Sequence, residues 1–379
     1  MTTASVTILV DLGNSETRAE LVYMGKNITI TVPNRFYELK SNYLIPEEYR
    51  NDDSIVFCND GIYLANGELV SIEFPKRGLA PIGFSNKSSQ ITSKYSIILL
   101  MIKAINKISG DIGVKASDIN WVFNIAVLLP PFEQDKRTND QPSGKEAMID
   151  LIRSITQINS VSPVKYSVPV AIKEIKVLPE GVIAFTAAMF KLEDGKININ
   201  SDNQKYKQGY CIVLDIGAGT TDMVVVRDGK FIMSTKETFR KGGNLVESTC
   251  RTLIRRKYNV SPSDMKEIIE TGVYHHANDT LIVDDLLDEA KKDYAENVLQ
   301  DIIAYLGEKD IPVQELRGVL TVGGGSLPTM RNGVVVSEPM SAPLVALLKQ
   351  FSPSIEQIKL DSNPRYANLD GLHIMSTAW

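Results

Sequence analysis

The chain has 379 residues, enough for two domains that each bury a hydrophobic core. Its 43% hydrophobic and 23% charged residues are typical of globular proteins, and its net charge of −5 provides no basic field to attract nucleic acid. Three cysteines cannot build a disulfide framework, and no apolar run is long enough to cross a membrane. We therefore expect a cytoplasmic protein that contacts neither nucleic acid nor membrane directly.

The first half opens with a predicted meander of three strands. An apolar run ends in Asp11, and Gly13, Asn14 and Ser15 form a turn before the next strand. Residues 36–80 then have the pattern of an insertion, with short strands joined by turns that contain Asn and Gly. The three strands of the meander are expected at Val6–Val10, Thr17–Tyr23 and Asn27–Val32.

Longer elements complete this half. Hydrophobic residues at helical spacing predict helices, and short apolar runs beside Pro or Gly predict buried strands. Glu180 stands immediately before the last of these elements, and residues 191–208 are polar and expected at the surface. The elements are a helix at Ile91–Ile108, a strand at Trp121–Leu129, a helix at Glu146–Ile158, one or two strands in Val164–Leu178 and a small apolar helix at Val182–Phe190.

The second half repeats this opening. An apolar strand at Tyr210–Ile216 has Asp215 near its end, and a turn of Gly217, Ala218, Gly219 and Thr220 leads into the next strands. The later elements are strands at Met223–Val226, Lys230–Glu237 and Arg317–Val322, helices from Gly243 and Asn244 to about Tyr258 and at Asp284–Leu306, the turn Gly323, Gly324, Gly325 and Ser326 with a short helix, and helices at Ala342–Gln350 and Arg365–Met375. The sum is an α/β chain with one mixed sheet in each half.

Two loops of this chain have the same sequence of features. Asp11 and Asp215 each end a strand before a glycine-containing turn, roughly 200 residues apart. Either loop alone fits an ordinary hairpin, but together they predict two half-domains that hold one polyphosphate. Backbone N–H groups in such turns bind anions, and carboxylates at strand ends suit Mg²⁺, mainly through its waters. Arg18 would bring positive charge to the phosphates.

Two further stretches fit the same chemistry. The glycines of Gly323–Ser326 allow close approach of a phosphate to a helix start, although a generic helix entry has the same pattern. Glu180 can orient a water that attacks a terminal phosphate, but its spacing alone favours a simpler role as an acid that stabilises a helix dipole. His275 and His276 lack a third ligand, and the sequence contains no P-loop motif.

Five stretches occur in the order found in the actin, sugar-kinase and DnaK-type ATPase superfamily, which the whole chain resembles. DLGNSETR is similar to its first phosphate motif and DIGAGTTD to its second. LPEGVIAF is similar to the first connecting motif, TVGGGS to the adenosine motif, and Asn368–Leu372 to the second connecting motif. Within the superfamily, the size of the chain resembles the ParM-like bacterial actins, which form filaments that segregate plasmids.

The resemblance implies an actin-like, ribonuclease H-like fold of two α/β domains, each a mixed sheet with flanking helices and a small subdomain. Domain I would span residues 1–178, with its subdomain at about 36–80 and a C-terminal helix, about 356–379, that returns to it. Domain II would span residues 179–355, with its subdomain at about 242–316. The implied ligand is ATP, or GTP, with Mg²⁺.

The resemblance also implies roles for single residues. Glu180 would orient the attacking water, Asp11 and Asp215 would bind Mg²⁺, and Arg18 stands where the superfamily more often has Lys. Gly243, Asn244 and the loop residues named above would bind the nucleotide. The implied function is ATP-driven assembly into filaments that segregate plasmid or phage DNA through an adaptor protein. The alternatives are a small-molecule kinase and an actin-fold ATPase that does not polymerise.

Overall fold

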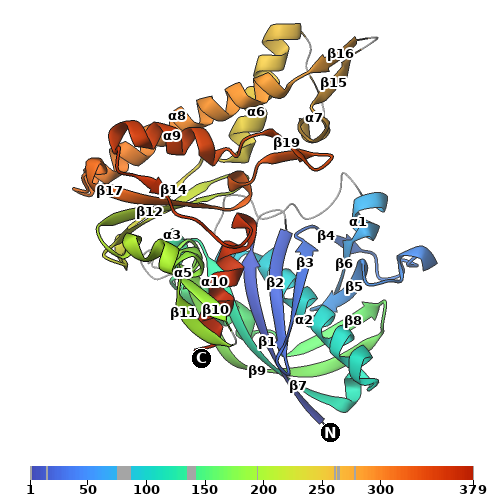
Figure 1. Ribbon diagram of the computed structural model, residues 1–379. Helices are drawn as coiled ribbons and strands as arrows, with labels where there is room; N and C mark the ends of the chain where they lie inside the picture. The colour runs from blue at the N-terminus through green and yellow to red at the C-terminus, as the bar shows by residue number, and fades with distance from the viewer. Residues whose placement is uncertain are drawn as a thin grey trace. The chain divides into compact units, whose positions relative to one another are not determined.

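The computed structural model describes residues 2–13, 16–74, 87–134, 142–193, 195–259, 262, 265–276 and 279–378. The chain forms two compact units, Met1–Pro179 and Glu180–Trp379 (Figure 1). Each unit combines a mixed sheet with helices, so the expected α/β class is confirmed. No helix in the described ranges is long and apolar enough to cross a membrane.

The first unit is built on a nine-stranded sheet of order β3-β2-β1-β7-β9-β8-β5-β6-β4. The central β1 pairs antiparallel with β2 and parallel with β7, which in turn pairs parallel with β9. The strands are β1 (Thr2–Leu12), β2 (Glu16–Tyr23), β3 (Lys26–Pro33), β4 (Phe36–Leu39), β5 (Ser54–Asn59), β6 (Ile62–Gly67), β7 (Ile119–Leu129), β8 (Gln157–Ser162) and β9 (Tyr166–Pro179). Residues 36–67 therefore extend the main sheet instead of forming a separate one, because β5 pairs with β8.

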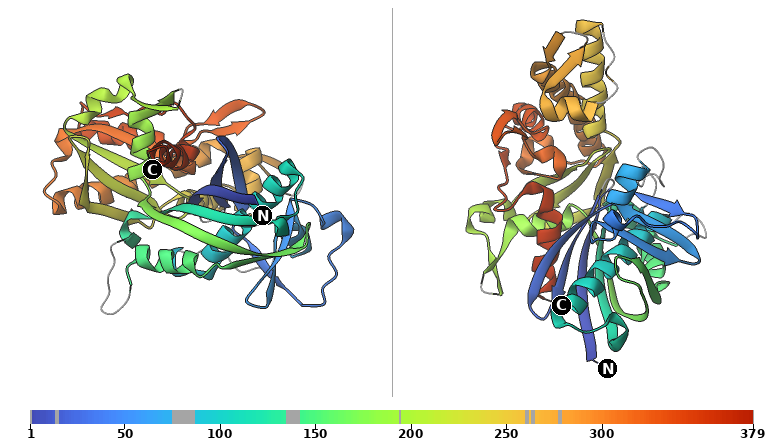
Figure 2. Two further views of the ribbon diagram at one scale, coloured as in Figure 1. Left: turned by 90° about the horizontal axis from the view of Figure 1, so that it is seen from below. Right: turned by 90° about the vertical axis from the view of Figure 1, so that its right-hand side faces the viewer.

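A long helix, α2 (Ile91–Ile112), covers β1, β2 and β3 of this sheet (Figure 2). Its apolar side packs into a core with Trp121 and Phe123 of β7, both fully buried. The other helices of the unit are α1 (Glu68–Glu73), α3 (Pro131–Gln134) and α4 (Gly144–Arg153).

The helix expected at 146–158 is too long by about one turn. The capping box of Ser143 and Glu146 begins α4, and the helix stops at Arg153. The next residues enter β8, which pairs with both β5 and β9. Long-range pairing in the sheet thus overrides the helical spacing of the apolar residues.

The second unit has a five-stranded sheet of order β14-β13-β12-β17-β20. Its strands are β12 (Tyr210–Ile216), β13 (Thr221–Arg227), β14 (Lys230–Phe239), β17 (Leu316–Val322) and β20 (Glu356–Gln357). β12 pairs antiparallel with β13 and parallel with β17, which pairs parallel with β20. The same order and directions occur in β3-β2-β1-β7-β9, so the repeat that the two loops predict extends to whole sheets.

Helices cover both faces of this second sheet. Ile212 and Leu214 of β12 pack into a core with α8 (Asp284–Glu308) and α9 (Ser341–Phe351), whereas Cys211 and Val213 pack into another with α5 (Val182–Met189). This alternation along β12 is that of a strand buried on both faces. The remaining helices are α6 (Gly243–Tyr258), α7 (Met265–Thr271) and α10 (Ala367–Ser376). Three two-stranded antiparallel sheets complete the described part of the unit: β10 (Phe190–Glu193) with β11 (Lys196–Ile199), β15 (Val273–His276) with β16 (Asp279–Ile282), and β18 (Thr329–Arg331) with β19 (Val334–Ser337).

The C-terminal helix α10 packs against α5 within the second unit. A Cβ atom on Gly371 of α10 would stand 1.9 Å from the Ile183 carbonyl oxygen of α5, so only glycine permits this approach. The resemblance implies that the segment from about residue 356 returns to the first half, whereas the structure groups that segment with the second unit.

Candidate functional site

In the first unit, Asp11 lies near the end of β1, directly across from Arg18 on β2. Nη1 of Arg18 is 3.8 Å from Oδ2 of Asp11, and Nη2 is 2.7 Å from Oε1 of Glu16. Burial raises the pKa of Asp11, and the positive charges of Lys87 and Arg18 oppose that rise. The loop therefore combines a buried acid with two cations.

A buried asparagine holds the first loop. The side-chain amide of Asn34 donates to the carbonyl of Gly13, and its Oδ1 accepts from the hydroxyls of Thr17 at 2.7 Å and Ser96 at 2.9 Å. Asn34 is fully buried and carries no motif signal, so the sequence did not identify it. The expected loop residues Asn14 and Ser15 lie outside the described residues.

Lys87 was also missed, because it stands in no motif. Its side chain is largely buried, and the carboxylate of Glu133 accepts hydrogen bonds from the backbone N–H groups of Lys87 at 3.0 Å and Ser88 at 3.2 Å. This pair of bonds fixes the chain just before α2 and keeps the Lys87 charge near Asp11.

In the second unit, Asp215 lies near the end of β12, across from Asp222 on β13. The two carboxylates occupy paired positions on one face of the sheet, where an unscreened pair of like charges is unfavourable. Asp222 is largely buried, and its Oδ1 accepts from the Thr238 hydroxyl. Asp222 belongs to the DIGAGTTD motif, and its register opposite Asp215 is the signal that could have identified it.

The second loop is closed by its own backbone and by the start of α6. The N–H of Gly217 donates to the Thr220 carbonyl at 2.9 Å. Gly243 donates to the carbonyl of Gly217 at 3.0 Å, and Asn244 donates to that of Ala218 at 2.6 Å. These two N–H groups are thus engaged in holding the loop, and together they fix the position of the α6 N-terminus beside it.

Two other motif stretches approach Asp215 directly, and a third is joined to it through Asn368. Nδ2 of Asn368, in the first turn of α10, donates to Oδ2 of Asp215 at 2.7 Å. A Cβ on Gly323 would stand 2.5 Å from Oδ1 of Asp215. The stretch Gly323–Ser326, which resembles the adenosine motif, therefore closely approaches the same carboxylate. Oδ1 of Asn368 accepts the N–H of Gly181, the residue after Glu180, at 3.1 Å.

The stretch Gly323–Ser326 does not begin the short helix that the sequence predicts. It forms a three-residue 3₁₀ turn, and the β18–β19 hairpin follows it. The reason is local, since Pro328 cannot donate the hydrogen bond that a continuing helix needs. Gly325 also packs closely on Ile216, where a Cβ would approach to 2.3 Å. The expected helix start is therefore wrong for this stretch, whereas the approach of a phosphate to its glycines stays a prediction.

Glu180 lies in a strained turn between β9 and α5. The N–H of Val182 donates to the Glu180 carbonyl at 2.7 Å across Gly181, whose φ is 72° and ψ is −50°. These values are close to those of the rare γ-turn with positive φ. Glu180 itself is only 5% exposed. Backbone strain of this kind occurs often at functional sites.

Taken unit by unit, the carboxylates favour a hard cation held largely through water. Asp11 in the first unit, and Asp215 and Asp222 in the second, offer carboxylate oxygens, which suit Mg²⁺. The described ranges contain no group of three or more His, Cys, Asp or Glu side chains that could hold a metal ion. Mg²⁺ characteristically binds to one or two carboxylates and completes its shell with water and substrate phosphates, so these residues fit it.

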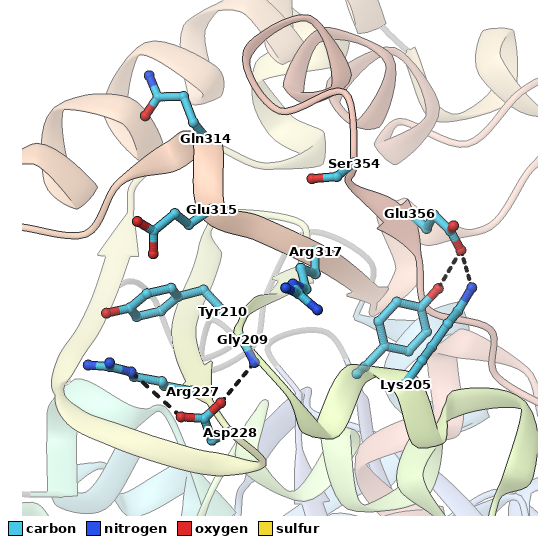
Figure 3. Close-up of a pocket in the computed structure, with 11 residues that line it drawn as sticks. Lys205, Gly209, Tyr210, Arg227, Asp228, Gln314, Glu315, Arg317, Ser354 and Glu356 are labelled. Atoms are coloured by element: carbon cyan, nitrogen blue, oxygen red, sulfur yellow. Dashed lines mark hydrogen bonds and ion pairs between the residues drawn. The ribbon is translucent and has the colours of Figure 1, made fainter.

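A separate pocket of about 640 Å³ lies at the opposite ends of β12 and β17, away from Asp215 (Figure 3). Its charges are largely paired: Lys205 binds Glu356, and Nε of Arg227 lies 3.7 Å from Asp228. Arg317 also lines it. None of the motif residues lines this pocket.

Solved structures decide the fold. An archaeal actin homologue superposes with a TM-score of 0.66 over 99% of this chain and 100% of its own, at 14% identity. The chain has the actin fold. ParM of Bacillus thuringiensis, solved with AMPPNP, gives a TM-score of 0.62 at 12% identity, covering 99% of this chain and 98% of its own. ParM from a 15-stranded filament of Clostridium botulinum gives 0.61 at 17% identity, covering 100% of both chains.

Comparisons of sequence cover a smaller part of this actin-fold chain than the comparisons of structure do. The family model "Archaeal actin homologue MreB-like, C-terminal" matches residues 213–332, which include the second loop and the adenosine-like stretch. No curated protein sequence matches the chain. The fold expected from the five motifs is thus confirmed, and these matches support the resemblance to archaeal and ParM-type actin homologues.

Proposed function

We propose that this protein binds ATP with Mg²⁺, hydrolyses it, and couples the cycle to assembly into filaments. The observation that carries the proposal is the meeting of separate motif stretches at Asp215: Asn368 and Gly323 approach its carboxylate, and Gly181 is joined to it through Asn368. Such agreement between distant sequence segments is typical of a functional site rather than of a generic hairpin. The fold similarity to a ParM solved with AMPPNP supports the nucleotide.

The binding roles follow from the positions of the loops. Backbone groups of Gly13, Asn14 and Ser15 in the first unit would contact phosphates, with Arg18 neutralising their charge. Gly217, Ala218, Gly219 and Thr220 would do the same in the second unit, with Gly243 and Asn244 holding that loop. Gly323, Gly324, Gly325 and Ser326 would approach the nucleoside part. GTP is the alternative to ATP, because the region expected to contact the base, within residues 242–320, matches the superfamily only loosely.

The chemical roles require few groups. Bound Mg²⁺ would neutralise charge on the phosphates. Asp11 and Asp215 would hold the waters of that ion in place. Glu180 would accept a hydrogen bond from the attacking water and orient it, which is the main task in phosphate hydrolysis. Its burial removes competing bulk water.

We also propose that filaments of this chain act in DNA segregation. The similar Clostridium botulinum ParM forms a filament, which supports self-association here. Filaments of this chain would segregate plasmid or phage DNA in the cytoplasm through an adaptor protein, since the chain lacks a basic field of its own. Residues of about 36–80 and 242–316 would be the small subdomains of the two domains.

Phosphate release and light scattering, measured together at several protein concentrations with Mg-ATP, test this function. A turnover rate per protomer that rises with protein concentration, along with scattering, is the expected result. Turnover without scattering at every concentration would identify an ATPase that does not polymerise. Turnover that requires a small hydroxylated acceptor would identify a kinase.

A further inference from the structure

Asn368 joins two parts of the proposed site through one side chain. It is 7% exposed, and both ends of its amide are engaged: Nδ2 donates to Asp215 at 2.7 Å, and Oδ1 accepts from the Gly181 N–H at 3.1 Å. The two partners also fix the orientation of the amide, because a carboxylate can only accept and a backbone N–H can only donate. An ionised carboxylate cannot donate, and an aliphatic side chain can neither donate nor accept, so neither could replace this pair of bonds.

The position of Asn368 is set by rigid packing. Gly371, one turn further along α10, rests against the Ile183 carbonyl in the first turn of α5. Ala367 and Leu372 beside it are fully buried. The first turns of α10 and α5 are therefore locked together, so the amide of Asn368 has little freedom to follow a displaced partner.

The Gly181 bond acts on the strained turn. The Val182-to-Glu180 hydrogen bond closes a γ-turn of the rare type with positive φ at its central residue, Gly181. Such a turn persists only when neighbouring groups hold it. The Asn368 carbonyl oxygen holds the N–H at its centre, and the direction of the Glu180 side chain depends on this turn.

We propose that Asn368 is a positioning residue that couples the metal-associated carboxylate of Asp215 to the water-orienting carboxylate of Glu180. This inference rests on the proposed function. In the wild-type protein, one amide sets the orientation of the Asp215 carboxylate and, through Gly181, the direction of Glu180. Loss of the amide should therefore affect two separable properties: the Mg²⁺ dependence of nucleotide binding through Asp215, and the hydrolytic step through Glu180.

The variant Asn368→Ala tests both expected effects, on the Mg²⁺ dependence of nucleotide binding and on hydrolysis. Binding of a fluorescent ADP analogue, titrated with Mg²⁺, should require roughly 10–100-fold more Mg²⁺ for half-maximal enhancement, the usual scale for residues that support metal ligands. The single-turnover hydrolysis rate at saturating Mg-ATP should fall by a similar factor. In a Glu180→Ala background, Asn368→Ala should lower the hydrolysis rate by less than about twofold more, because residues that act through one another are not additive.

Asn203→Ala is the matched control. Asn203 is buried in the same unit, and its amide bridges Ala188 of α5 and Lys359 of the C-terminal segment at 2.8 Å each, away from Asp215. Its loss should lower the melting temperature about as much as the loss of Asn368, while the Mg²⁺ requirement and the hydrolysis rate stay within about twofold of wild type.

The outcomes separate this inference from the proposed function. A wild-type protein that neither binds nor hydrolyses Mg-ATP overturns the proposed function, and the role of Asn368 with it. An active wild type with an unchanged Mg²⁺ requirement in Asn368→Ala overturns the inference alone. Equal effects of Asn368→Ala and Asn203→Ala, or additive effects with Glu180→Ala, also overturn it, since they would indicate a structural role only.

Discussion

At the scale of single residues, uncharged neighbours position the acids of the second unit. Asp215 is held by an asparagine amide and approached by Gly323, and Glu180 is carried by a turn that only glycine readily adopts. The first unit uses Asn34 in the same way on the loop of Gly13. The chemistry of the candidate site thus depends on residues that carry no charge.

Glu180→Ala should slow ATP hydrolysis by roughly 10²–10⁴-fold, the range for a group that orients water or transfers a proton. Nucleotide binding and assembly should persist, because a carboxylate that orients the attacking water acts on hydrolysis and not on holding the nucleotide, and the filaments should then be long-lived. Glu174→Ala, at a half-exposed position on β9, is the control and should match wild type. Filaments of Glu180→Ala that disassemble at the wild-type rate would contradict the assigned role.

Asp11→Asn should change stability in a pH-dependent way in protein free of nucleotide and metal. Burial raises the pKa of Asp11, so the folded state disfavours its ionised form. The wild type therefore loses stability relative to Asp11→Asn as the pH rises through the raised pKa, and the difference closes below about pH 4, where Asp is also protonated in the unfolded chain.

Urea unfolding from pH 4 to pH 7 measures this difference in the free energy of unfolding. Asp111→Asn, at the end of α2 where the carboxylate is half exposed, should show little pH-dependent change. A free-energy difference for Asp11→Asn that stays constant over this range would show that burial does not govern the carboxyl group.

The sequence identified the acidic residues of the two loops but not the residues that position those loops and acids. Asp11 and Asp215 were recognisable because each ends an apolar strand before a glycine turn. Asn34, Lys87 and Asn368 were not assigned roles, because each acts on a partner far away along the chain and local spacing cannot report such pairs.

At the scale of elements, the close contact of α5 and α10 fixes the geometry around Asp215. Gly371→Ala would force a Cβ against the Ile183 backbone, so the helices must separate. We expect a loss of about 1–3 kcal/mol in the free energy of unfolding, the usual range for overpacking, along with weaker Mg-nucleotide binding.

Gly307→Ala in α8 is the control for this change, because nothing lies within 4 Å of the added methyl group. It should stabilise the protein by about 0.5–1 kcal/mol through helix propensity. Denaturant unfolding compares the two variants, and a neutral Gly371→Ala would refute the close helix contact.

Local patterns predicted most elements and missed those set by distant partners. The strand at 210–216 and the helix from 243 to 258 were found from apolar spacing and glycine boundaries. The helix at 146–158 was predicted too long because β8 forms only by pairing with β5 and β9. The turn at Gly323 was predicted as a helix start because glycine-rich turns precede many helices.

At the scale of the whole molecule, two sheets repeat one plan of five strands. The two similar loops predicted this repeat, whereas the addition of β8, β5, β6 and β4 to the edge of the first sheet required the structure. The actin fold follows from full-length structural similarity, and the filament function rests on the proposal above.

Electron microscopy of the protein with Mg-ATP tests the central claim most directly. We expect filaments with Mg-ATP, none without nucleotide, and none for Asp215→Ala, because that change should weaken Mg-nucleotide binding itself. Filaments of equal length and number with and without nucleotide, or dispersed protomers at every concentration with bound Mg-ATP, would contradict the account.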